Sequence, residues 1–223
     1  MRKQLRRLAL SCTPAILLSA SAVCAQDASS ALARAETAYR GLNALAAEFS
    51  QTLVNPMLGA PERSSGQIFL DPPSRFAMRF TNPGGDRIVA DGTWLWLYAP
   101  STVPGQVIRQ AIPHSGISSP NLMAQFVDRP LDRYDVAYVG EDDVAEETVD
   151  VVRLTPRAES LGFRWAEIAV ARSDGILRRI DLMEESGQRR TLVFNAIRTQ
   201  VEIPDGELRF VVPEGVRIVE PDS

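Results

Sequence analysis

The chain has 223 residues, two cysteines and a formal net charge of −4 at pH 7. Its length is sufficient for one sizeable hydrophobic core. The acidic balance argues against a nucleic acid as partner, because proteins that bind nucleic acids carry basic surfaces.

The first 25 residues have the layout of a secretory signal peptide. A basic start precedes the mostly apolar run 8–20, and the small residues at 23–25 offer a cleavage site. The apolar run is short for a membrane span. We therefore expect residues 1–25 to be a signal peptide that is removed on secretion, and residues 26–223 to form a single domain.

Removal of the signal peptide changes the chemistry of the remaining chain. Cys12 and Cys24 are the only cysteines, so the mature chain has no disulfide, no thiol nucleophile and no thiolate metal ligand. Cleavage also removes four cations and no anion, which takes the formal net charge from −4 to −8. An alternative makes Cys24 a lipidated amino terminus, although Val23 is an unfavourable residue before such a cysteine.

The spacing of apolar residues changes along the mature chain from a helical repeat to a strand-like alternation. Apolar residues from Leu32 to Leu42 repeat at helical spacing and predict a helix over 29–43. From residue 45 the period is two, and Asp-Gly pairs mark tight turns between the alternating runs. The predicted strands lie near 45–54, 64–71, 74–81, 86–90, 93–99, 106–112, 133–140, 147–155, 163–172, 176–185, 189–201 and 207–212.

The pattern breaks once, between residues 113 and 132. Ser119 and Pro120 mark the start of a second predicted helix. Most other connections are too short for crossover helices, which favours an antiparallel sheet. A sheet of about 11–12 strands tends to curl toward a barrel, and two helices suffice for a lid. The second helix carries an apolar stripe of Leu122, Met123, Phe126 and Val127.

Residues suited to catalysis or metal binding are few. His114 is the only histidine and lies in a predicted loop, so the sequence lacks a histidine-based zinc site. The acidic stretch 141–147 is interpreted as a solvated hairpin tip, with calcium binding as the alternative. We expect no enzyme activity, no metal and no cofactor. A hydrolase that depends on His114 is the competing hypothesis.

Both faces of the predicted strand 93–99 are apolar. Side chains on a strand alternate, so Trp94, Trp96 and Tyr98 share one face while Leu95 and Leu97 share the other. An antiparallel sheet commonly exposes one face to water. Each face here must instead be covered by core packing, a helix, a partner or an apolar ligand.

Several short motifs occur in a characteristic order along the mature chain. They include Phe49-Ser50-Gln51, the run from Gly66 to Phe76, Asn82-Pro83, the run from Ile88 to Gly92, Leu95 to Tyr98, Leu154 to Arg157, and Val212 to Val216. In order and spacing these motifs resemble the outer-membrane lipoprotein carrier protein family, LolA. The resemblance covers nearly all of the mature chain and implies an α+β, mainly β, fold: an unclosed antiparallel β-barrel with a helical lid over an apolar cavity.

The resemblance also implies a role and partners. Family members are periplasmic chaperones that accept triacylated lipoproteins from an inner-membrane lipoprotein-releasing ABC transporter and deliver them to an outer-membrane receptor lipoprotein. We expect a monomer with this role. The alternative is a related periplasmic lipid-binding module, such as a glycolipid carrier or a sensor of envelope stress.

The expected lipid-binding residues are large apolar side chains of the strands and the second helix. We expect the aromatic face of strand 93–99 to point into the cavity, because flat rings cover an irregular wall well. Pro72 stands where well-studied members have an arginine that latches the lid, so Arg75 and Arg79 are the latch candidates, or the latch is missing. The expected lipid-binding residues are Phe49, Phe76, Met78, Phe80, Trp94, Trp96, Tyr98, Leu122, Met123 and Phe126.

Overall fold

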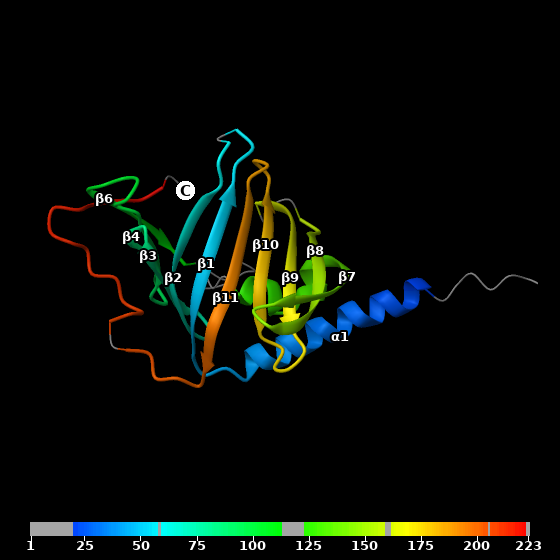
Figure 1. Cartoon of the computed structure of the whole chain (residues 1–223). Coiled ribbons are helices and arrows are strands. Elements are labelled where there is room, and N and C mark those ends of the chain that lie inside the picture. Colours follow the sequence, from blue (N-terminus) through cyan, green and yellow to red (C-terminus); the bar gives the residue numbers. More distant parts are fainter. Residues whose placement is uncertain (1–19, 58, 113–122, 159–161, 205, 222–223) are drawn as a thin grey trace, which may run out of the picture.

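The computed structural model describes residues 20–57, 59–112, 123–158, 162–204 and 206–221 (Figure 1). Its helices are α1 (Ala20–Arg40), α2 (Ala124–Val127) and α3 (Pro130–Arg133). Its strands are β1 (Leu45–Val54), β2 (Glu62–Asp71), β3 (Arg75–Asn82), β4 (Gly84–Ala90), β5 (Trp94–Tyr98), β6 (Gln106–Ala111), β7 (Tyr134–Val144), β8 (Glu147–Pro156), β9 (Phe163–Ala171), β10 (Leu177–Glu184), β11 (Arg189–Thr199) and β12 (Arg217–Val219).

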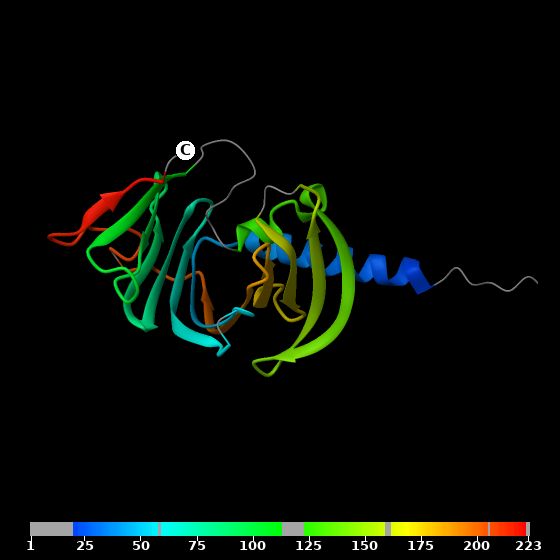
Figure 2. The same cartoon turned by 90° about the horizontal axis from the view of Figure 1, so that it is seen from above.

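These twelve strands form one curled sheet in the order β12-β6-β5-β4-β3-β2-β1-β11-β10-β9-β8-β7. Neighbouring strands are antiparallel except at one edge, where β12 runs parallel to β6. The end strands β12 and β7 do not pair, so the sheet curls without closing (Figure 2). The predicted unclosed, mainly β antiparallel architecture is confirmed.

Tight turns and two long-range pairings produce this order. At the turn between β4 and β5, Gly92 has φ +99°, and the Asp91 carboxylate accepts the backbone N–H groups of Thr93 (2.9 Å) and Trp94 (2.8 Å). Each strand pairs with the next strand along the chain from β1 to β6, and again from β7 to β11, so the sheet has two halves. The pairing of β1 with β11 then joins the two halves.

The helices lie on one face of the sheet, which we call the inner face. α1 packs against β7, β8, β9 and α2. Its buried residues Ala28, Ala31, Leu32 and Ala35 follow helical spacing and form a single apolar stripe. Among the described residues, no helix is both long and apolar enough to span a membrane.

Apolar side chains are buried on both faces of the sheet. The inner-face cluster joins the helices to strand residues such as Leu45, Phe76 and Phe194. The outer-face cluster includes Trp96 and is covered by what we call the C-terminal segment, residues 201–204 and 206–216. This segment leaves β11 and crosses the outer side of the sheet before β12 (Figure 1).

Most element predictions agree with the structure, but β12 was not predicted and two other elements differ. Eleven predicted strands coincide with β1 to β11. The predicted strand 207–212 is wrong, because this stretch lies over the face of the sheet rather than beside an edge strand. Alternation at Leu208, Phe210 and Val212 therefore reflects one buried side and not sheet pairing. α1 begins before the predicted residue 29 and ends at Arg40, close to the predicted stop.

Candidate functional site

The two apolar faces of β5 have different coverings. Leu95 packs against the inner-face cluster, whereas Trp96, Trp94 and Tyr98 belong to or pack against the outer-face cluster. The expectation that the aromatic side chains point toward a cavity under the helices is wrong. Alternation alone does not distinguish the faces, and the C-terminal segment covers the aromatic one.

The outer-face aromatic residues form a solid contact with the C-terminal segment. The rings of Trp96 and Phe210 stack with centroids 5.3 Å apart, and Tyr98 lies 5.6 Å from the same Phe210 ring. The Arg109 guanidinium lies 4.3 Å from the centre of the Trp94 ring, which is cation–π distance. The contacts of Trp96 and Tyr98 with Phe210 therefore fix the C-terminal segment on the sheet.

Asp91 fixes the same cluster from the β4–β5 turn. Its carboxylate accepts the Trp96 indole N–H at 2.8 Å, in addition to the backbone N–H groups of Trp94 and Thr93. Burial alone would raise the pKa of Asp91, but these donors together hold the pKa below its ordinary value. Asp91 therefore has a structural role as a charged hydrogen-bond acceptor.

One hollow of the described residues, about 890 Å³, lies between the C-terminal segment and the outer side of the sheet. Charged side chains of Asp71, Arg75, Asp91 and Arg209 contribute to its lining. An alkyl chain placed there would desolvate these charges at a cost. Size alone therefore does not make this hollow an apolar ligand site.

Another hollow, of about 270 Å³, lies on the inner face, and we call it the inner pocket. Residues of β1, β3, β4, β5, β10, β11 and α2 contribute to its walls. Most of its lining is aliphatic or aromatic, and a few polar side chains accompany it. The lining residues are Gln51, Phe76, Met78, Ile88, Leu95, Gln125, Leu182, Glu184, Arg190 and Leu192.

Several expected lipid-binding residues gather on the inner face. Phe76 and Met78 line the inner pocket. Phe49 belongs to the inner-face cluster, and its ring contacts that of Phe80 edge-on at 5.1 Å. Met123 also belongs to this cluster. Leu122 lies outside the described residues.

The short helix α2 places Phe126 at the centre of the inner-face cluster. Phe126 is fully buried, with its ring 5.8 Å from that of Phe163 and 6.5 Å from that of Tyr134. The Tyr134 hydroxyl donates a hydrogen bond to the carbonyl oxygen of Gln125 at 2.8 Å. α2 thus fills the inner face beside the pocket that Gln125 helps to line.

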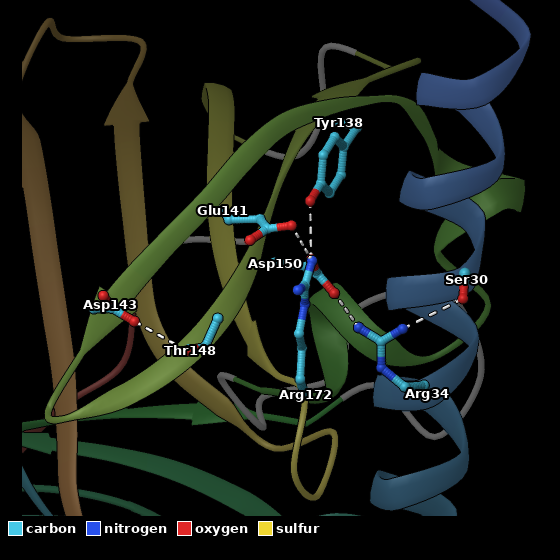
Figure 3. Close-up of polar contacts among 8 residues, drawn as sticks. All are labelled: Ser30, Arg34, Tyr138, Glu141, Asp143, Thr148, Asp150 and Arg172. Atoms are coloured by element: carbon cyan, nitrogen blue, oxygen red, sulfur yellow. Dashed lines mark hydrogen bonds and ion pairs between the residues drawn. The ribbon is translucent and has the colours of Figure 1, made fainter.

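Asp150 on β8 is the centre of a polar cluster that fastens α1 to the sheet (Figure 3). Its carboxylate accepts hydrogen bonds from the Tyr138 hydroxyl at 2.9 Å, from Arg172 Nη2 at 2.6 Å, and from Arg34 of α1. Arg34 also donates to Ser30 Oγ at 3.3 Å, one turn earlier. One carboxylate that is 5% exposed therefore links α1, β7, β8 and the turn after β9.

The protonation equilibria of this cluster follow from the same contacts. Burial alone would raise the pKa of Asp150, but hydrogen bonds from Arg172, Tyr138 and Arg34 hold the pKa below its ordinary value. Burial and the contact with Asp150 raise the pKa of Tyr138. Asp150 and Glu141, which accepts from Arg172 at 2.7 Å, raise the pKa of Arg172. At neutral pH Asp150 and Arg172 are therefore charged, and Tyr138 keeps the proton that it donates to Asp150.

The contact between α1 and the β9–β10 turn is close. Gly175 has φ +76°, and a Cβ at this position would lie 2.8 Å from the carbonyl oxygen of Arg34. The hollow lined by α1, α2 and this turn has a volume of only about 10 Å³. α1 is therefore a closely fitted part of the inner-face core.

The two candidate latch arginines lie on the outer face. Arg75 pairs with Asp71, and Arg79 pairs with Glu207 of the C-terminal segment at 3.3 Å. Both alternate along β3 with inward residues such as Phe76. The prediction that either arginine latches the helices is wrong, because the strand places them on the opposite face. The ion pair of Arg34 with Asp150 instead joins α1 to the sheet.

The acidic hairpin tip is engaged by arginine side chains. Asp142 accepts from Arg179 at 2.8 Å, and this contact holds the pKa of Asp142 below its ordinary value. Asp143 accepts from the Thr148 hydroxyl at 3.1 Å. Among the described residues, no group of three or more His, Cys, Asp or Glu side chains is arranged to hold a metal ion. His114 lies outside the described residues.

Sequence reasoning missed the polar part of the inner pocket. Gln51 lies two residues beyond the inward Phe49 on β1, and Arg190 lies two residues before the inward Leu192 on β11. Extension of each alternating pattern by one step would have placed both polar side chains on the inner face. The role of Asp150 needed the three-dimensional contact with α1.

Comparison with known proteins shows the family. The family described as outer membrane lipoprotein carrier protein LolA matches residues 40–211. The chain belongs to the LolA family. An outer-membrane lipoprotein carrier protein of Chromobacterium violaceum is 26% identical over 210 residues, which cover 92% of this chain and 97% of the relative.

Solved structures show that the LolA-like fold is shared more widely. An uncharacterized conserved protein of Thermus thermophilus has a TM-score of 0.54 at 14% identity, with 86% of this chain and 98% of that chain covered. A structure of MucB has a TM-score of 0.52 at 20% identity, with 83% of this chain and 63% of that chain covered. At these identities the similarity concerns the fold alone.

Proposed function

We propose that this LolA-family protein is a carrier that holds the acyl chains of lipoproteins in the inner pocket. The observation that carries the proposal is an apolar hollow on the face covered by helices, in a chain whose family is described as lipoprotein carriers. The other apolar face supports no such role, because the C-terminal segment covers it. Aliphatic residues such as Ile88, Leu95 and Leu192 suit contact with alkyl chains.

Release sets a limit on how tightly the chains are held. Burial of acyl chains contributes about 0.8 kcal/mol per methylene, so a fully buried lipid anchor would leave very slowly. In the structure, Phe126 and Met123 are buried in the inner-face cluster. We infer that cargo displaces these side chains and enlarges the inner pocket. The helix then competes with cargo for the same apolar surface, which weakens net binding.

The proposed movement belongs to α2 rather than α1. α2 has four residues and no side-chain hydrogen bond at its N-cap, so its displacement breaks few helical hydrogen bonds. α1 is joined to the sheet by the Arg34–Asp150 ion pair and by its close fit to Gly175. α1 therefore acts as a fixed wall while α2 gives way.

The family and the amino-terminal sequence support a proposal for the location and the partners. We infer that residues 1–25 direct secretion, are removed, and leave residues 26–223 as a monomeric single domain in the periplasm. We further infer that it receives triacylated lipoproteins from an inner-membrane lipoprotein-releasing ABC transporter and delivers them to an outer-membrane receptor lipoprotein. A carrier of this kind needs no catalytic group, no metal and no cofactor.

The test is identification of the bound molecule. The secreted protein is purified from a Gram-negative host under mild conditions, and extracts are analysed by mass spectrometry. Triacylated lipoprotein is the expected ligand. Free glycolipid would favour the alternative of a glycolipid carrier, and an unloaded protein that binds another envelope protein would favour a stress sensor. A hydrolase would release free fatty acid from the bound lipoprotein, and we expect no such release.

A charge in the inner pocket should prevent loading. Ile88 is half-buried and lines the pocket, so Ile88→Glu would place an unpaired carboxylate against an alkyl chain and reduce lipoprotein per mole of protein at least about tenfold. Val193→Glu is the matched control, because Val193 is a half-buried aliphatic residue that packs on a separate, outer cluster. Equal loading of folded Ile88→Glu and wild-type protein would contradict the proposed site.

A further inference from the structure

The inner face changes from apolar to polar at one end of three neighbouring strands. β1, β11 and β10 are adjacent in the sheet, and each continues its inward apolar series with a polar side chain. The three pairs of inward residues are Phe49 and Gln51 on β1, Leu192 and Arg190 on β11, and Leu182 and Glu184 on β10. All three polar residues line the inner pocket, which therefore has a polar edge.

A hydrogen-bond chain orders this polar edge. Arg190 donates to Gln51 Oε1 at 3.3 Å and to Glu184 Oε1 at 3.1 Å. Gln51, which is only 7% exposed, donates in turn to Ser64 Oγ at 3.1 Å. The Arg190 side chain is 33% exposed. The contacts hold the guanidinium at the pocket edge.

Arg190 retains hydrogen-bonding capacity for a ligand. A guanidinium has five N–H donors. Within the described part of the chain, Arg190 donates to Gln51 and Glu184. Glu184 balances its positive charge, so the polar edge as a whole is close to neutral. Such an edge suits a neutral acceptor, such as a carbonyl oxygen, better than a second carboxylate that would meet Glu184.

Each acyl chain has such an acceptor in the ester or amide group that links it to the rest of the lipid. The hydrocarbon part gains by entering the apolar part of the pocket, while the ester or amide carbonyl oxygen loses free energy if it is buried without a donor. The carbonyl is therefore most stable at the polar edge, beside a guanidinium with donors to spare. A pocket with this gradient sets both the direction and the depth at which the chain enters.

We propose that Arg190, oriented by Gln51 and Glu184, donates hydrogen bonds to the ester or amide carbonyl of an acyl chain bound in the inner pocket. Arg190 is then the residue that makes the site select acyl-linked lipids over carbonyl-free alkyl chains and over free fatty acids. This inference rests on the proposed function and adds the chemistry by which the same pocket recognises its ligand.

The test compares two synthetic ligands and two variants. The ligands are a triacylated lipopeptide with ester-linked and amide-linked chains, and an analogue whose chains are attached by carbonyl-free ether and alkyl links. Arg190→Met keeps a long apolar stem and removes the donors. Arg189→Met is the matched control, because Arg189 belongs to the same strand but pairs with Asp181 at 3.3 Å and lies near the Trp165 ring, on the outer side.

We expect Arg190→Met to weaken binding of the acyl lipopeptide about tenfold, as for the loss of one or two charge-assisted hydrogen bonds, and to leave the ether analogue unchanged. Arg189→Met should bind both ligands like the wild type. Arg190→Lys retains a donor and should lie between wild type and Arg190→Met, which keeps the test usable if Arg190→Met unfolds. A diacylphosphatidylglycerol with short chains shows whether an ester carbonyl without a peptide is recognised in the same way.

The outcomes separate this inference from the proposed function. Wild-type protein that binds neither lipopeptide would overturn both. A second outcome is that the wild-type protein binds both ligands and Arg190→Met either binds both equally more weakly or binds both as the wild type does. This outcome would overturn only the role of Arg190. Loss confined to the acyl-linked ligands supports it, and an equal loss for the phospholipid identifies the ester carbonyl as the recognised group.

Discussion

Replacement of Asp150 by asparagine tests whether this carboxylate fastens α1 to the sheet. The amide keeps the size of the side chain and one acceptor oxygen, but it removes the charge that Arg34 and Arg172 face. A hydrogen bond to a charged group contributes about 1.5–3 kcal/mol. The arginine side chains are 35% and 44% exposed, so solvent screens part of this. We therefore expect a loss of about 2 kcal/mol in the free energy of unfolding.

Urea unfolding at pH 7, followed by circular dichroism, measures this loss. A lower midpoint with an unchanged slope would report a change in stability alone. Asp135→Asn is the matched control: Asp135 is also a strand aspartate paired with an arginine, Arg157, at 2.9 Å, but its side chain is 74% exposed. Its loss should stay within about 0.5 kcal/mol. If both variants lost equal stability, the clamping role of Asp150 would be refuted.

The pH dependence provides an independent check. The pKa of Asp150 is lower in the folded protein than in the unfolded chain. Its charge therefore contributes stability that is fully present above the unfolded pKa and is lost as the pH falls through the folded pKa. The deficit of Asp150→Asn relative to wild type should be constant from pH 5 to pH 8 and shrink below about pH 4. A deficit of equal size at pH 3 and pH 7 would refute the electrostatic explanation.

Three further variants probe the outer face and the contact of α1 with the sheet. Phe210→Ala removes the ring stacked on Trp96 and should lower the free energy of unfolding by about 3 kcal/mol, with a red shift of tryptophan fluorescence. Lipopeptide binding should persist. Loss of binding in the folded variant would contradict the outward placement of the aromatic face. Gly175→Ala and Gly105→Ala both place alanine at positive φ (+76° and +75°), but only the first meets the carbonyl oxygen of Arg34. Urea unfolding should show a loss of about 1 kcal/mol for Gly105→Ala and clearly more for Gly175→Ala, and equal losses would argue against close packing of α1 on the turn.

The sequence predicted the strands well because local chemistry determines them. Period-two alternation and Asp-Gly turns are properties of a few neighbouring residues, and β1 to β11 lie where these signals predict. The wrongly predicted strand 207–212 shows what alternation means physically. Leu208, Phe210 and Val212 alternate because one side of the segment is buried against the outer-face cluster, and alternation carries no information about hydrogen bonding to an edge strand.

The direction of the β5 side chains was beyond the reach of local signals. Trp96 and Leu95 are both apolar neighbours on one strand, so either could face the helices. The choice is made by Phe210, more than a hundred residues later, which stacks on Trp96 and covers that face. The latch candidates failed for a different reason: Arg75 and Arg79 alternate along β3 with the inward Phe76, so the strand itself places them on the outer face, where Arg79 pairs with Glu207.

The different coverings of the two faces are consistent with the demands on a carrier. On the outer face, Trp96 and Phe210 make a stacked contact, and Asp91 holds the Trp96 indole in place. The inner pocket is lined largely by aliphatic side chains and leaves about 270 Å³ beside a four-residue helix. Well-filled contacts of aromatic rings make a face rigid. A face that must admit alkyl chains and release them needs unfilled volume and a neighbour that can be displaced; the inner pocket provides the volume, and the movement of α2 that we propose would provide the second.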